Sequence, residues 1–283
     1  MEKGLPQFKG KALIEIPANI PQAGFLEGDF GKAFLEEYNG RVKSDYNDSS
    51  ALKVLSYDNN IVKGSNPFAV VLANQILRQE GLRTASQADL EKVISTNAFN
   101  LKGTYEDTGL VLRSMEEPNK YLAENLAKQI KARGKKIRTP IMFSLNGLEV
   151  VNDSNSPQGL AFKITDETEL IYALILDGKN NGKSFSQTDK YGLPSKLGEG
   201  SRTLYTRENG LDGFYLCRYS DVDSSNGNLA SSNDNGLVVA VANPAGTQKI
   251  LNDYLKNLQI QRDKEVAEID KRYQKAEKVL GGK

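Results

Sequence analysis

Residues 209–247 read NGLDGFYLCRYSDVDSSNGNLASSNDNGLVVAVANPAGT and contain no Lys, Glu, Gln, Met or Trp. All the residue types in this stretch can be encoded by codons that end in a pyrimidine. Such a bias is expected where the adenines of Asn codons are scrambled while the third base stays fixed. A loop region rich in Gly, Asn and Ser would also contain little Lys and Glu, so composition alone leaves both explanations open.

The order of residues within this stretch is regular. Between Phe214 and Asp223 the spacing of apolar residues is mostly two, which is the period of a strand with one buried face. The intervening residues have a composition close to that of antibody paratopes, in which Tyr gives rigid contact area and Ser and Asn give adaptable hydrogen bonds. The predicted buried residues are Leu211, Leu216, Val222, Leu229, Val238 and Val239. The candidate ligand-binding residues are Asp212, Tyr215, Arg218, Tyr219, Asp221, Asp223, Asn226, Asn228, Ser231, Asn233, Asp234 and Asn235.

The run 210–241 resembles the variable proteins of diversity-generating retroelements, in particular those of archaea and their viruses. The matching features are Gly210-Leu211, a Ser-x(4)-Leu-Ala-x-Ser-Asn step at 224–233 and a closing Gly-x-Val-Val at 236–239. In that family a reverse transcriptase copies a template repeat with errors at adenines, and the copy replaces the variable region. The resemblance implies a C-type lectin fold that displays the altered side chains as a ligand-binding surface. The chain departs from many C-type lectin folds in having no Trp.

Length and charge set limits on the rest of the chain. With 283 residues there is room for two domains or one large one,. A net charge of +1 gives no global field that would point to nucleic acid or membrane,. The sequence has no apolar run of the roughly 18 residues needed to cross a membrane, and its N-terminus lacks the apolar core of a signal peptide. We therefore expect a cytoplasmic or virion-associated protein.

The residue types present exclude several kinds of catalytic and metal site. Histidine is absent, which removes Ser-His and Cys-His nucleophilic systems and His-ligated zinc,. The single cysteine, Cys217, excludes an intrachain disulfide and a Cys-rich metal site,. Carboxylates or Lys could still act as catalysts, but no spacing favours them. We expect a protein that is not an enzyme and that carries no cofactor.

Three further motifs are weak. Residues 178–184 (GKNNGKS) resemble a phosphate-binding loop, but Asp177 stands where the first Gly is required,. The segment from Asp221 begins like a calcium loop, yet Asn226 and Ser232 replace its Gly and Glu, so an EF-hand is excluded and only calcium in a lectin-like loop remains possible,. A basic group fits the solvated end of a helix better than a nucleic-acid site; it comprises Lys128, Lys131, Arg133, Lys135, Lys136 and Arg138.

Periodicity predicts an α+β chain in three parts. In a mainly helical N-terminal region, 1–138, Asn66-Pro67 opens one helix that Gly81 ends, and 86–95 and 118–133 form two more, whereas 40–65 is mostly loop,. An irregular antiparallel β domain follows at 139–243, and the resemblance implies that it has a C-type-lectin-like fold with its variable region at about 209–243. The predicted strands are 141–145, 148–151, 160–164, 170–176, 202–207 and 236–242,.

A C-terminal helix is predicted at 244–283, opened by Asn243-Pro244. Its broken apolar seam fits either a coiled coil that makes a homo-oligomer or a single helix packed on its own domain. The expected function is binding of an unknown protein or cell-surface ligand by a diversified, receptor-binding surface, with no nucleic-acid or membrane partner. The alternative is an undiversified carbohydrate-binding or calcium-dependent lectin-like module.

Overall fold

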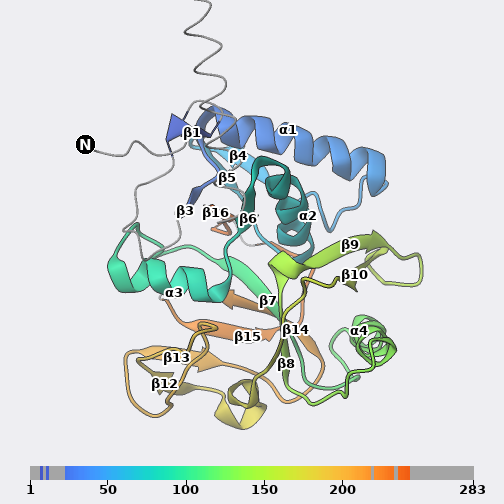
Figure 1. Ribbon diagram of the computed structural model, residues 1–283, viewed down its shortest axis with the longest axis vertical. Coiled ribbons are helices and arrows are strands. Elements are labelled where there is room, and N and C mark those ends of the chain that lie inside the picture. The colour runs from blue at the N-terminus through green and yellow to red at the C-terminus, as the bar shows by residue number, and fades with distance from the viewer. Residues whose placement is uncertain (1–6, 9–10, 13–22, 218–219, 233–234, 243–283) are drawn as a thin grey trace, which may run out of the picture.

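The computed structural model of the chain describes residues 7–8, 11–12, 23–217, 220–232 and 235–242 (Figure 1). Within this part the fold is mixed α+β, as the sequence predicts, and its largest element is a curled seven-stranded sheet. The strands of this sheet are, in spatial order, β11 (Leu170–Tyr172), β8 (Ile141–Ser144), β7 (Glu106–Leu112), β14 (Leu211–Leu216), β15 (Val222–Asn226), β13 (Arg202–Tyr205) and β12 (Lys183–Phe185). Neighbouring strands are antiparallel except β13 and β15, which run parallel.

Smaller sheets and four helices surround the large sheet (Figure 1). A three-stranded sheet places β16 (Val239–Ala242) between β3 (Ala23–Phe25) and β6 (Leu82–Thr84). Three hairpins pair β1 (Gln7–Phe8) with β2 (Lys11–Ala12), β4 (Ser56–Asp58) with β5 (Ile61–Lys63), and β9 (Leu148–Asn152) with β10 (Leu160–Ile164). The helices are α1 (Gly28–Asp45), α2 (Pro67–Leu77), α3 (Gln87–Thr96) and α4 (Lys120–Ala132), and short 3-10 turns are η1 (Arg78–Glu80), η2 (Leu145–Gly147), η3 (Leu174–Leu176) and η4 (Gly178–Asn180).

The predicted helix boundaries are confirmed where capping residues mark them. The side chain of Asn66 accepts a hydrogen bond from the backbone N–H of Ala69 at 2.7 Å and so caps α2,. Ser86 and Asp89 form a reciprocal capping box at the start of α3,. Each cap satisfies backbone N–H groups that the first turn of a helix leaves unpaired.

Several elements differ from the prediction, among them helix α1 and strand β7. Helix α1 runs to Asp45, into the segment 40–65 that was expected to be mostly loop. Its buried residues Phe30, Phe34, Tyr38 and Val42 recur every four residues, so the helical pattern was present in a segment that otherwise contains many polar residues,. Strand β7 lies inside the region predicted to be mainly helical.

Strand β7 is a central strand of the large sheet. It pairs with β8 on one side and with β14 on the other, so the sheet joins strands from both sides of the expected boundary between 138 and 139. The strand is buried on both faces and therefore lacks the alternation that marks a half-buried strand,. A Cβ at Gly109 would lie 2.9 Å from the carbonyl oxygen of Phe143, so glycine allows β8 to approach.

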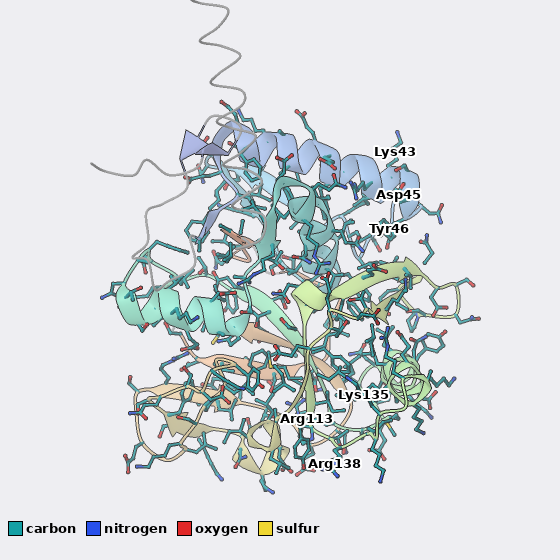
Figure 2. The ribbon with its side chains drawn as sticks, viewed as in Figure 1. Lys43, Asp45, Tyr46, Arg113, Lys135 and Arg138 are labelled. Atoms are coloured by element: carbon teal, nitrogen blue, oxygen red, sulfur yellow. The ribbon has the colours of Figure 1, made fainter. Side chains whose placement is uncertain are left out.

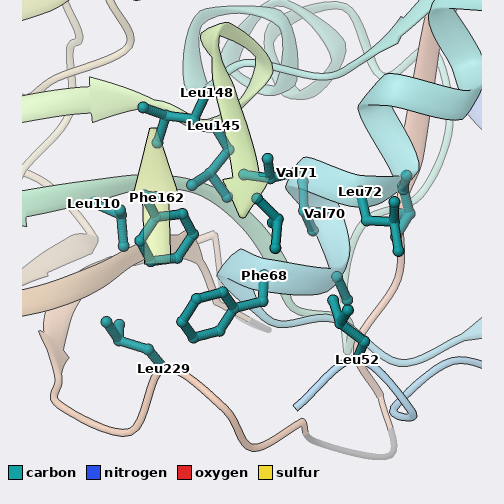
Figure 3. Packing of buried hydrophobic residues seen from close by; sticks show 14 of the residues in the cluster. Leu52, Phe68, Val70, Val71, Leu72, Leu110, Leu145, Leu148, Phe162 and Leu229 are labelled. Atoms are coloured by element: carbon teal, nitrogen blue, oxygen red, sulfur yellow. The ribbon is translucent and has the colours of Figure 1, made fainter. Parts of the chain in front are cut away.

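The largest apolar cluster extends from Leu26 to Ala242 in the sequence. At its centre the rings of Phe68 and Phe162 stack with centroids 4.3 Å apart, and Leu229 of the biased run belongs to the same cluster (Figure 3). The run is thus built into the same core as α2 and the β9–β10 hairpin.

The predicted C-terminal helix, 244–283, lies outside the described residues. In the part of the chain that the structure describes, no helix combines the length and apolarity needed to cross a membrane. The basic residues that follow α4 are exposed, and Figure 2 shows Lys135 and Arg138 at the surface there.

Candidate functional site

The apolar residues of the run are buried, as predicted. Leu211, Leu229 and Val238 belong to the largest cluster, Leu216 and Val239 belong to a second cluster beneath α3, and Val222 belongs to a third. Because the run contributes to all three clusters, its backbone is fixed from several directions.

Several polar residues of the run, exposed or half buried, gather around one hollow with a volume of about 200 Å³. Most of its lining comes from the run. The rest comes from the start of α2 and the segment before it, and from β7 and the residue that precedes it. The lining residues are Ser65, Pro67, Tyr105, Asp107, Gly213, Tyr215, Asn226, Asn228, Ser231, Ser232 and Gly236. Four of the predicted ligand-binding residues are therefore brought together: Tyr215, Asn226, Asn228 and Ser231.

Tyr215 stands in a row that crosses the sheet. On β14 it lies opposite Asp107 of β7 and opposite Asp223 of β15, and Asp223 in turn lies opposite the exposed Tyr205 of β13. The ring of Tyr105 adds a second aromatic face, with its centroid 6.1 Å from that of Tyr215. Register shifts next to Tyr215 in both strand pairs locally re-aim the side chains, as bulges do beside functional sites,.

The carboxylate of Asp107 is half buried and makes its hydrogen bond with Ser65, whose Oγ donates to Oδ2 at 2.6 Å. Burial raises the pKa of Asp107 to about 6. Asp223 accepts hydrogen bonds from the backbone N–H and the Oγ of Ser225, at 2.7 and 2.8 Å. Burial, and then the Asp223 carboxylate, raise the pKa of Tyr215, so this phenol keeps its proton.

Asn226 and Asn228 also organise their own loop. Oδ1 of Asn226 accepts from the backbone N–H of Asn228 at 2.9 Å, and Oδ1 of Asn228 accepts from those of Ala230 and Ser231 at 3.2 and 3.1 Å. Such side-chain turns leave the amide nitrogens of both residues pointing away from the turn and able to donate.

Asp212 and Asp221 were predicted to face a ligand, and the structure corrects both. Asp212 is completely buried and accepts a hydrogen bond from Nη1 of Arg113 at 2.8 Å. Figure 2 shows Arg113 in the interior of the molecule, where it also binds Leu176 O, Thr206 and Ser224. Alternation failed here because β14 is covered on both faces, so the outward side of the strand is not solvent,.

Asp221 is buried for a different reason. Its carboxylate accepts a hydrogen bond from the backbone N–H of Thr203 at 2.6 Å and so joins the turn after β14 to strand β13. Of the other predicted residues, Asp223 is half buried, and Asn235 is exposed at the rim, where its carbonyl accepts from the backbone N–H of Tyr105 at 3.1 Å. Arg218, Tyr219, Asn233 and Asp234 lie outside the described residues.

Sequence reasoning missed the part of the hollow that precedes the run. Ser65, Pro67, Tyr105 and Asp107 lie more than a hundred residues before Tyr215 along the chain. The pairing of β7 with β14 brings Asp107 opposite Tyr215, and hydrogen bonds from Ser65 to Ser232 and Asp107 hold the segment at the start of α2 beside them. Pro67 was identified only as the first residue of a helix, and Asp107 lies in a strand that the sequence did not indicate.

Among the described residues, no group of three or more His, Cys, Asp and Glu side chains is arranged to hold a metal ion. The side chains around the hollow offer hydrogen-bond donors and acceptors, two aromatic faces and one carboxylate. No protein-family model matches this chain, and neither the curated proteins nor the solved structures include a significant match to it.

Proposed function

We propose that this chain is a non-enzymatic ligand-binding protein whose exposed face, built from residues 209–243, is diversified by retroelement mutagenesis. The observation that carries the proposal is the division of the run by burial: its predicted apolar anchors lie in three core clusters, whereas exposed and half-buried polar residues of the run line one hollow. A protein that keeps its backbone while its ligand changes needs this division. Exposed substitutions typically change stability by less than about 0.5 kcal/mol, so the lining can vary at little cost.

The anchors between the lining residues support the same proposal. Leu229 follows Asn228 and is almost completely buried, which contributes roughly 1.5–3 kcal/mol for a side chain of this size,. Oγ of Ser232 accepts a hydrogen bond from the backbone N–H of Ser65 at 2.8 Å, and Nδ2 of Asn66 donates to the carbonyl of Ala230 at 2.9 Å. The loop that carries Asn228 and Ser231 is therefore held at points on either side of its exposed residues.

We propose further that the displaying part has a C-type-lectin-like fold and that its ligand is a protein or a cell-surface molecule. Irregular strands with long connections and a polar, Tyr-containing surface support this assignment,. The second candidate is an undiversified carbohydrate-binding module. It is favoured by the same combination of Tyr faces with Asp and Asn side chains around a small hollow.

The neighbouring DNA separates the two candidates. Diversification requires a near-copy of the segment that encodes 209–243, differing at adenines, beside a reverse transcriptase gene. If the natural locus contains neither, the diversification proposal is wrong and the undiversified module remains.

A pair of libraries tests the division by burial in the protein itself. One library varies Tyr215, Asn226, Asn228 and Ser231, and the matched library varies Asp212, Leu216, Val222 and Ser224, which are buried in the same run. We expect most members of the first library to fold and some to bind new protein targets, and most members of the second to be insoluble. Equal loss of folding in both libraries would show that the hollow is structural.

We also propose that residues 244–283 make the chain a homo-oligomer, because repeated copies of a small polar face gain avidity of about 10²–10⁴ when several can bind at once. Light scattering on the whole chain and on a chain that ends at Asn243 measures this. We expect the whole chain to be an oligomer and the shortened chain to be a monomer. If both chains are monomers, residues 244–283 pack on their own chain and the oligomer proposal is wrong.

A further inference from the structure

The hollow has two halves of different origin. Ser65, Pro67, Tyr105 and Asp107 come from outside the run, whereas the opposite half comes from residues 213–236. If the run is diversified, the first half stays constant in every version of the protein. Whatever the constant half binds is then a chemical feature shared by the ligands, and the variable half selects among them.

The constant half carries an uncompensated negative charge. Among the described residues Asp107 makes no ion pair, and the lining contains neither Lys nor Arg. The titratable groups on the neighbouring strands are Glu106, Tyr215 and Asp223, together with Tyr105, and none of them carries positive charge. A carboxylate in this position loses hydration, and no cation compensates for the loss. A ligand that placed a cation beside the carboxylate would recover part of this desolvation free energy.

Two aromatic faces stand beside the same carboxylate. The rings of Tyr105 and Tyr215 are inclined at 47° to each other, and Tyr215 lies opposite Asp107 in the sheet. Cations bind to the faces of tyrosine rings through the ring quadrupole, and they do so more strongly when water is partly excluded. A volume of about 200 Å³ is smaller than the pockets that hold drug-sized ligands, so it suits one side chain or one sugar ring,.

We propose that the hollow binds the cationic side chain, arginine or lysine, of a protein ligand, with Asp107 as the constant counter-charge and the rings of Tyr105 and Tyr215 beside it. This inference rests on the proposed function and names the chemistry of its ligand. The guanidinium or ammonium group donates to the oxygens of Asp107, which Ser65 holds in place,. Asn226, Asn228 and Ser231 then contact the residues that flank the cation.

The test uses the full-length chain and two small probes that differ in charge. N-acetyl-argininamide is titrated into isotopically labelled protein while amide signals are followed by NMR, and N-acetyl-citrullinamide serves as the neutral probe of nearly equal shape. We expect saturable shifts at Tyr105, Asp107 and Tyr215 with the arginine probe and none with citrulline at the same concentration. A series of methyl glycosides forms a third arm, since a single sugar ring is the competing occupant.

Two variants localise the effect. Asp107→Asn removes the charge with little change in shape, and we expect it to weaken binding of the arginine probe at least about tenfold, the effect of one charge-assisted hydrogen bond. Asp166→Asn removes the same charge from an exposed carboxylate on another part of the surface and is expected to leave binding unchanged. Because the pKa of Asp107 is about 6, affinity should rise about tenfold between pH 5 and pH 7, and this dependence should vanish in Asp107→Asn,.

The inference is overturned if citrulline binds as well as arginine, if Asp107→Asn binds like the unchanged protein, or if the glycosides shift the hollow and arginine does not. These outcomes are separate from failure of the proposed function, which the paired libraries test without reference to charge. If the library members that bind new targets show no preference for basic targets, the proposed binding face stands and the inference that it binds a cationic side chain is wrong.

Discussion

The acidic residues near the two ends of strand β14 differ in whether a cation lies beside them. At one end Asp212 is buried against Arg113, which supplies a cation and shares its remaining donors with Leu176, Thr206 and Ser224. At the other end Leu216 and Tyr215 lie opposite Glu106 and Asp107, and neither of these acids has a cation among the described residues. Asp212 has a cation beside it in the interior, whereas Glu106 and Asp107 have no cation among the described residues, and this difference separates scaffold from site.

The largest effect is expected at the paired end. Asp212→Asn leaves the guanidinium of Arg113 buried without its counter-charge, and breaking a buried pair in this way typically costs about 3–5 kcal/mol,. Chemical denaturation measures the loss. Asp107→Asn at the other end serves as the comparison and should cost much less; similar losses at both ends would remove the distinction.

At the unpaired end we expect a smaller effect that depends on pH. Neither carboxyl oxygen of Glu106 has a hydrogen-bond partner among the described residues, and burial raises its pKa to about 8. The folded state therefore holds a proton that the unfolded state loses above its ordinary pKa of about 4.5,. Stability should fall by up to about 4 kcal/mol as pH rises from 5 to 8.

Glu106→Gln isolates this contribution because it cannot ionise. Its melting temperature should vary less with pH than that of the unchanged protein and should exceed it at pH 8. Asp107 has a raised pKa of about 6 and contributes a decline of the same sign at lower pH, so the variant is expected to retain some slope below pH 7. Identical pH profiles for the two proteins would show that Glu106 is ionised in the fold.

Two glycines near the hollow, Gly213 and Gly227, allow a finer comparison. A Cβ at Gly227 would lie 2.8 Å from the side chain of Pro118, so Gly227→Ala is expected to cost about 1–3 kcal/mol as overpacking,. A Cβ at Gly213 would meet its nearest neighbours at 3.5 Å or more, which is ordinary contact, and Gly213→Ala should fold normally while narrowing the hollow. Thermal melting of the two variants checks both statements.

The smallest effect is expected at the exposed rim. Asn226→Ser, Asn228→Ser and Ser231→Ala together should move the melting temperature by less than about 5 °C, because serine keeps an acceptor for each turn and the sites are exposed,. Leu229→Ala, within the same loop, should cost roughly 2–5 kcal/mol because it empties a core position,. A large loss in the triple variant would show that the rim supports the fold.

The features of the fold and the site that could be predicted are those that depend on residues close together in the sequence. The cap at Asn66, the start of a helix near Ser86 and the buried spacing of Leu216, Val222 and Leu229 depend on near neighbours, and the sequence indicated them correctly. The burial of Asp212 could not be predicted, because it depends on Arg113, which lies almost a hundred residues earlier. The constant half of the hollow was missed for the same reason, since it reaches the run through contacts between distant segments, the pairing of β7 with β14 and the hydrogen bond between Ser65 and Ser232.

The position of β16 has a consequence for how the chain folds during synthesis. Because β16 lies between β3 and β6, the three-stranded sheet cannot form until residue 242 has left the ribosome. Strand β3 therefore remains without its pairing strand β16 during most of translation. Contacts this distant in sequence are slow to form. If the run is diversified, each new version must also complete this sheet, so a version that misfolds fails before it meets any ligand.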